Sequence, residues 1–231
     1  MKIISENLLF IDQVLIILKQ LIFYINLHDE LSDSTITLVN TMFCFLRNML
    51  NEPDIADRVN QSEMVSTFNL IASSNNESLK LNVCNLIAYT AHANDIKEMA
   101  NLSELLDTVF QSLKTLMNQK SDKTTEIEQL LDTLQGFTQH DQVKSEILKQ
   151  NAIPLLADCT TQLEGKALVL AYDVIWKLSF NEEIRDILNS YPNLVDRIRK
   201  IAHDDKNEPL KRVASGIFWK LEKGRLALYL I

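Results

Sequence analysis

A block of five residues that is rich in apolar side chains appears five times along this chain. The blocks end at intervals of 40 to 48 residues, at Met49, Tyr89, Phe137, Leu178 and Leu221. After each of the first four blocks, two aliphatic side chains follow at helical spacing, namely Ile55 with Val59, Ile96 with Met99, Val143 with Ile147, and Ile184 with Leu188. A repeat of this period predicts stacked helical units.

The pattern divides the chain into helices of expected position. It predicts an N-terminal helix pair within 8–50, with helices at about 8–28 and 34–50. Four three-helix units follow, each with a short first helix, a second helix and a longer third helix that ends with the apolar block; they cover 53–91, 94–139, 141–180 and 182–223. We expect residues 1–231 to form one all-α domain that closes with a tail at 224–231.

Two segments carry a resemblance to a known family. Asn151-Ala152-Ile153-Pro154-Leu155-Leu156 resembles the start of the second helix of an armadillo repeat, and Ile175-Trp176-Lys177-Leu178-Ser179 resembles a run in its third helix. The resemblance implies a right-handed α-solenoid of armadillo-like repeats over roughly 34–223, with 8–28 as part of an incomplete first unit. HEAT-like repeats are the alternative, because the glycine that usually precedes the second helix is Asn151 here.

The last unit carries a second, shorter resemblance. Residues 210–223 resemble the closing repeat of armadillo regions that precede Toll/interleukin-receptor-type signalling domains in some invertebrate proteins. This likeness implies an alternative role, in which the repeats are the regulatory region of a larger signalling protein with such a domain beyond residue 231.

Composition favours a binding protein over an enzyme. The chain has only four Gly and four Pro, too few for the many turns of a sandwich or barrel, and its isolated glycines form no phosphate-binding loop. His92 and His140 fall one repeat apart, too far to share a zinc ion with bonds of about 2 Å. We find no catalytic constellation and expect no enzyme activity, cofactor or metal site.

Cysteine usage and hydropathy bear on location. Cys44 and Cys84 each lie five residues before the end of a block, so both are expected to be small, buried packing residues, and neither they nor Cys159 forms a CxxC site. The apolar stretch 8–27 contains Asp12 and Lys19, which interrupt a membrane span or a signal peptide. We expect a cytoplasmic protein that does not enter a membrane.

Charge is unevenly distributed along the chain. The formal net charge is −8, yet Lys and Arg gather after residue 196. If the third helices line a concave groove, as in armadillo proteins that bind extended peptides, the C-terminal repeats present a basic and aromatic surface. Its predicted partner-binding residues are Tyr172, Trp176, Lys177, Phe180, Arg212, Trp219, Lys220 and Lys223.

The predicted groove differs from that of peptide-binding relatives. The family pattern places a Trp with an Asn four residues later in successive third helices, and here Trp176 and Trp219 are followed by Phe180 and Lys223 instead. A basic and aromatic groove favours an acidic or phosphorylated protein segment. The alternative is that both tryptophans are ordinary packing residues. Nucleic acid is disfavoured by the acidic net charge.

The two ends of the chain are strongly apolar. The segment from Leu8 to Leu18 is apolar nearly all round, and 226–231 is apolar as well, whereas terminal repeats of a solenoid normally have a polar outer face. The ends are therefore expected to mediate self-association or to continue into further domains, unless they fold back on their own repeats. The favoured function is a non-catalytic scaffold that binds a peptide or helix on its third-helix face.

Overall fold

The computed structural model describes residues 2–28, 32–50, 52–74, 76–119, 123–204 and 206–228, and it describes no side chains for 2–8, Pro53, Asp204 and 223–228. All regular structure in these residues is α-helical. The chain contains two compact units, Met1–Thr108 and Val109–Ile231. We expected one continuous domain, and that expectation stays a prediction.

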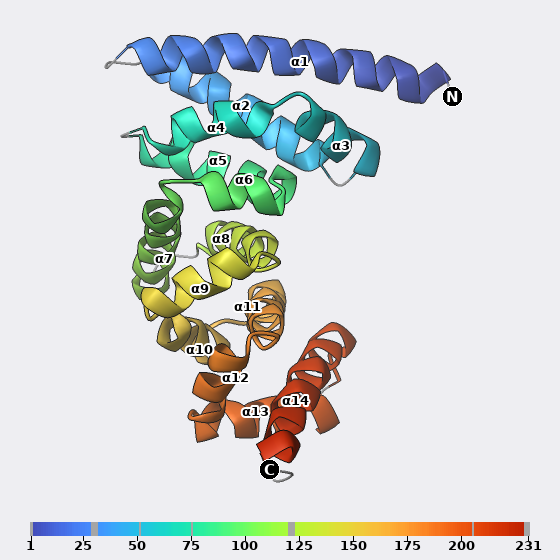
Figure 1. Ribbon diagram of the computed structural model, residues 1–231, viewed down its shortest axis with the longest axis vertical. Helices are drawn as coiled ribbons and strands as arrows, with labels where there is room; N and C mark the ends of the chain where they lie inside the picture. Colours follow the sequence, from blue (N-terminus) through green and yellow to red (C-terminus); the bar gives the residue numbers. More distant parts are fainter. Residues whose placement is uncertain are drawn as a thin grey trace. The chain divides into compact units, whose positions relative to one another are not determined.

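The first unit follows the predicted order of helices (Figure 1). The N-terminal pair is α1 and α2, the first repeat is α3 to α5, and α6 and the start of α7 follow; their bounds are Lys2–Leu27 (α1), Asp33–Met49 (α2), Pro53–Gln61 (α3), Met64–Ala72 (α4), Glu77–Thr90 (α5), Ala93–Glu98 (α6) and Leu102–Asn118 (α7). Helix α1 packs against α2, α3 and α4, and α5 packs against α2, α3 and α4.

The second unit holds the remaining repeats. Its helices after α7 are Thr124–Phe137 (α8), Asp141–Lys149 (α9), Ile153–Gln162 (α10), Gly165–Leu178 (α11), Glu182–Asn189 (α12), Pro192–Asp204 (α13) and Glu208–Leu228 (α14). The third helices of successive repeats lie side by side, because α11 packs against both α8 and α14 (Figure 1). This layer of third helices is the arrangement that the repeat pattern predicted.

Two predicted features differ from the structure. Helix α14 continues to Leu228, so most of the predicted tail is helical, and residues 229–231 lie outside the described part of the chain. The third helix is the longest of its unit except in the repeat 94–139, where α7 has 17 residues and α8 has 14. In this repeat the second helix is therefore the extended one.

The cores combine residues of the apolar blocks with apolar side chains from the other helices. In the first unit, Phe43 of α2 meets Phe68 of α4 edge-on, with ring centroids 6.1 Å apart, and both rings are fully buried. In the second unit, Leu134, Tyr172, Leu178 and Ile217 are buried on the third helices. Burying a side chain of this size stabilises the fold by about 1.5–3 kcal/mol. Apolar residues therefore recur at the same positions of each unit, because each unit must cover the apolar face of its third helix.

Candidate functional site

The surface predicted from the sequence lies where α11 and α14 pack together. Helix α11 buries Ala171, Tyr172 and Ile175, and α14 buries Val213, Ala214 and Ile217. Apart from Tyr172, these buried side chains are small or branched.

Trp176 is fixed by a glycine on the facing helix. A Cβ atom placed on Gly216 would lie 2.6 Å from Nε1 and 2.7 Å from Cε2 of the Trp176 indole, closer than real Cβ atoms approach. The indole therefore lies directly on the backbone of α14 and is only partly exposed. Trp176 is therefore partly a packing residue and partly a surface residue, because the indole packs on α14 and is still partly exposed.

Beside Trp176 lies a group that we call the aromatic–lysine cluster, made of Trp176, Phe180, Trp219 and Lys220. Phe180 and Trp219 are each 52% exposed, which is unusual for large aromatic side chains. The Trp176 and Phe180 ring centroids are 6.4 Å apart. Lys220 Nζ lies 3.9 Å from the Phe180 centroid and 5.3 Å from the Trp219 centroid, within the range of cation–π contacts.

Other predicted residues are placed differently. Tyr172 is fully buried, so it belongs to the core and is not part of the exposed surface. Lys177 donates a hydrogen bond to the Gln135 carbonyl at 3.1 Å and lies 3.7 Å from the Asp173 carboxylate. Its charge is therefore already partly compensated within the repeat layer.

The remaining basic residues lie on α14. Arg212 is exposed, whereas the Lys223 side chain lies outside the described part of the structure. Gln135, which takes the Trp position in the preceding repeat, donates a hydrogen bond to Asp173. Between α8 and α11, this layer holds polar side chains that hydrogen-bond to each other. Between α11 and α14, it holds exposed aromatic rings beside the ammonium of Lys220.

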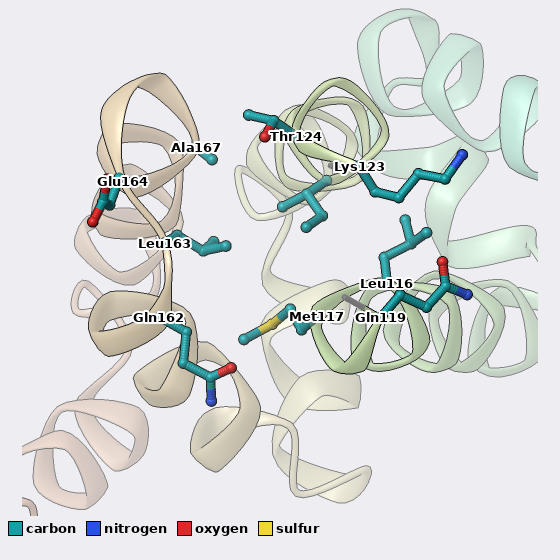
Figure 2. A pocket seen from close by; sticks show the side chains of 10 residues that line it. Leu116, Met117, Gln119, Lys123, Thr124, Gln162, Leu163, Glu164 and Ala167 are labelled. Carbon is teal, nitrogen blue, oxygen red and sulfur yellow. The ribbon is translucent and has the colours of Figure 1, made fainter. Parts of the chain in front are cut away.

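A cleft in the same unit was not predicted. It has a volume of about 320 Å³ and lies between the end of α7, the start of α8 and the α10–α11 turn (Figure 2). Its lining combines apolar with polar side chains, namely Leu116, Met117, Gln119, Lys123, Thr124, Ile127, Gln162, Leu163, Glu164 and Ala167.

Lys123 is the basic side chain of this cleft, and it is already paired. Lys123 Nζ pairs with Glu126 Oε1 at 2.8 Å, and this contact raises the pKa of the lysine. Gly165 has φ +56° at the α10–α11 turn and leaves open space around its Cα. Among the described residues, no cluster of three His, Cys, Asp or Glu side chains could hold a metal ion.

The cleft had no direct signal in the sequence, whereas all four residues of the aromatic–lysine cluster were among the predicted partner-binding residues. The cleft depends on how four helix ends meet, which no local pattern records. The exposure of Phe180 and Trp219 depends on how α11 and α14 pack, and the close contact of Trp176 with Gly216 is one part of that packing. A glycine opposite a tryptophan in neighbouring third helices is the one signal that could have indicated it.

Comparison with solved structures supports the fold. An engineered protein superposes with a TM-score of 0.62 at 12% identity, covering 90% of this chain and 80% of that chain. A designed armadillo repeat protein gives a TM-score of 0.61 at 14% identity over 88% and 80%. A computationally designed armadillo repeat protein for modular peptide recognition gives 0.60 at 13% over the same shares. These likenesses show an all-α solenoid of armadillo-type repeats.

Family comparison identifies the relatives of this solenoid. No curated protein matches the sequence. The model of one family, however, that of the H subunit of V-ATPases, matches residues 12–225. The matched range includes every helix from α2 to α13, most of α1 and the greater part of α14. The chain therefore belongs to the V-ATPase H-subunit family.

Proposed function

We propose that this chain is a non-catalytic, protein-binding component of a V-ATPase assembly and that the aromatic–lysine cluster binds a peptide or helix of a neighbouring protein. The observation that carries the proposal is the pair of half-exposed rings, Phe180 and Trp219, held beside Lys220 on a layer of third helices. Membership of the V-ATPase H-subunit family supports the choice of assembly.

The chemistry of the cluster favours one kind of ligand. Exposed Trp and Phe side chains supply most of the affinity at protein interfaces, because burying them removes large apolar areas from water. The Lys220 ammonium is held beside two rings, so an acidic or phosphorylated residue of the partner would pair with it. Arg212 is exposed on the same helix and adds a second positive charge that guides orientation.

We place this binding in the cytoplasm. The three cysteines are not joined by disulfides, as expected of a protein in a reducing compartment. Cys84 and Cys159 are buried within their own units, where a thiol packs as a small apolar side chain and needs no oxidation for stability.

Affinity capture from an extract of the source organism tests the proposal. The tagged wild type should retain V-ATPase subunits identified by mass spectrometry, and Trp219→Ala should reduce their recovery at least about tenfold, as expected for an aromatic anchor. Combined charge reversal of Lys177, Arg212 and Lys220 should also reduce it. Leu70→Ala is the matched control, because Leu70 is 42% exposed and lies outside the cluster.

The outcomes separate the two parts of the proposal. Retention of V-ATPase subunits by every variant would contradict the binding surface. Absence of V-ATPase subunits from the wild-type capture would contradict the assembly. Circular dichroism must show equal helicity in all variants, so that loss of binding reflects the surface and not unfolding.

A further inference from the structure

Helix α1 carries a large apolar face that none of the described residues covers. Its opposite face is buried against α2, α3 and α4 through Ile11, Leu15, Leu18, Ile22 and Ile25. The outer side chains are between 48% and 64% exposed, and they are Leu9, Phe10, Ile16, Ile17, Phe23, Tyr24 and Leu27. Exposed apolar patches of this size mark interaction sites.

Between Leu9 and Leu27, the charged residues leave this face clear. Asp12 accepts two hydrogen bonds from Arg58 of α3, from Nε at 2.6 Å and from Nη2 at 2.7 Å. Lys19 donates to the Ser62 carbonyl at 2.8 Å. Both are therefore directed toward the α3 side, and between Leu9 and Leu27 the outer face holds the uncharged amides of Gln13 and Gln20.

The outer positions follow a seven-residue spacing. Leu9, Ile16 and Phe23 form one row, Phe10, Ile17 and Tyr24 form a second, and Gln13, Gln20 and Leu27 form a third. A spacing of seven keeps the same face of a helix turned toward a partner helix, as in coiled coils. The face is therefore built to pack along another helix and not merely to touch one at a point.

Eight of these nine positions, all except Leu27, are also symmetric about the midpoint between Ile16 and Ile17, whereas Leu27 would exchange with Glu6. Reversing the direction of the helix exchanges Ile16 with Ile17, Gln13 with Gln20, Phe10 with Phe23, and Leu9 with Tyr24. Each of these exchanges keeps the character of the side chain: aliphatic, amide, phenyl or large apolar. A face with this property is self-complementary about a two-fold axis, which is the requirement for an isologous dimer.

We propose that a second copy of this chain covers the outer face of α1 and that the two α1 helices pack antiparallel about a two-fold axis between Ile16 and Ile17. Gln13 of one copy then faces Gln20 of the other. Each amide can donate to and accept from its counterpart, which satisfies the polar groups within the apolar contact and selects this register.

The area available matches a stable dimer. Seven large side chains, each about half exposed and presenting roughly 100 Å² or more, approach the value of about 800 Å² per partner that standard interfaces bury. Phe45 of α2 adds to the edge of the face, because its ring meets Phe10 edge-on with centroids 5.9 Å apart.

A membrane is the main competing occupant. Leu9–Leu27 is long and apolar enough to cross a membrane by length and composition. However, five of its side chains are already buried in the first unit, and the ion pair of Asp12 with Arg58 ties it to α3. Crossing a membrane would separate these contacts, whereas pairing with a second copy preserves them.

Sedimentation equilibrium of the purified full chain tests the proposal with a charge exchange. The wild type should show a concentration-dependent dimer. Gln13→Glu/Gln20→Glu places carboxylates opposite each other and should weaken dimerisation at least about a hundredfold. Gln13→Glu/Gln20→Lys should restore it, because the antiparallel register places each glutamate opposite a lysine, whereas a parallel register would place like charges together.

Disulfide trapping checks the register independently. In a Cys44→Ser background, Gln13→Cys/Gln20→Cys should form a covalent dimer on oxidation, and Gln13→Cys alone should not, because its two copies would lie about 10 Å apart along the helices. The substituted positions are exposed, so each variant should keep the thermal melting curve of the wild type.

Several results would overturn the proposal. One is a wild type that stays monomeric at high concentration, and another is a dimer that is equally stable in Gln13→Glu/Gln20→Glu. Binding of the monomer to phospholipid vesicles through this face would assign it to a membrane. Binding of another V-ATPase component to the monomer through this face would assign it to that assembly.

Discussion

At the scale of single residues, the three thiols are distinguished by burial. Burial raises the pKa of the Cys84 thiol to about 12. Burial, with a contribution from the adjacent Asp158 carboxylate, raises the pKa of Cys159 to about 12 as well. Cys44 is exposed on α2. The thiolate is the reactive form, so the three residues should react at very different rates.

We therefore predict that a thiol reagent at pH 8 modifies one cysteine of the native chain quickly and all three only in denaturant. Cys44→Ser should remove the fast reaction and leave the slow ones unchanged. Titration with a chromogenic disulfide measures both the number and the rate. Modification of Cys84 or Cys159 in the native chain as fast as Cys44 would contradict the burial of these two thiols.

The exposure of Cys44 shows where residue-level prediction failed. Cys44 and Cys84 hold equivalent places in the repeat, and the sequence predicted burial for both. Only Cys84 is buried, because α5 packs against α2, α3 and α4, whereas α2 packs against α1 and α5. The incomplete first unit supplies fewer neighbours, and the repeat pattern contains no record of that difference.

At the scale of helices, the sequence predicted nearly every element. The apolar blocks mark the third helices because these must be covered on several sides, and prolines mark several helix starts. Caps were less predictable. Asp95 followed by Glu98 has the pattern of a helix start, but α6 begins at Ala93 and Asp95 accepts a hydrogen bond from the His92 amide at 2.7 Å. The two possible helix starts lie less than one turn apart, and the residues at both have similar tendencies to begin a helix.

The ion pair between Asp12 of α1 and Arg58 of α3 predicts how the stability of the fold changes at acidic pH. The Arg58 guanidinium donates to Asp12 and holds the pKa of that carboxyl below its ordinary value of 3.8. A depressed pKa stabilises the folded state above the ordinary value, and that contribution is lost as pH falls through the lower folded value. Asp12→Asn should therefore reduce stability at pH 7, with the difference from wild type shrinking below pH 3.8.

Urea unfolding followed by circular dichroism at neutral and acidic pH measures this difference. Asp57→Asn serves as the control, because Asp57 is an exposed carboxylate on the same helix as Arg58. The effect is expected to be small, since exposed ion pairs contribute little and are screened by salt. A difference between wild type and Asp12→Asn that stays constant with pH would contradict the role of the charge.

At the scale of the whole molecule, the spacing of the apolar blocks predicted the fold but did not predict the function. A repeat near 40 residues fixes helix number and order, whereas the partner depends on the few side chains that the repeats leave outside. Family membership now supports the choice of assembly, and the alternative of a regulatory region followed by a Toll/interleukin-receptor-type domain stays a prediction. The cleft beside α7, α8 and α10 has no assigned ligand.

The two proposed surfaces belong to different units of the chain, which leads to a last prediction. The α1 face lies in Met1–Thr108, and the aromatic–lysine cluster lies in Val109–Ile231. If each surface acts through its own side chains, Gln13→Glu/Gln20→Glu should abolish the dimer and still capture V-ATPase subunits. Trp219→Ala should lose those subunits and still sediment as a dimer.

Both readouts should therefore be taken on both variants, with Leu70→Ala as the common control. Independent losses would assign self-association to α1 and partner binding to α11 and α14, because substitutions at sites that share no partner act additively. Loss of V-ATPase capture in the α1 variant would mean that only the dimer binds, since pairing can raise affinity through two simultaneous contacts. Loss of the dimer in Trp219→Ala would contradict the assignment of self-association to α1 alone.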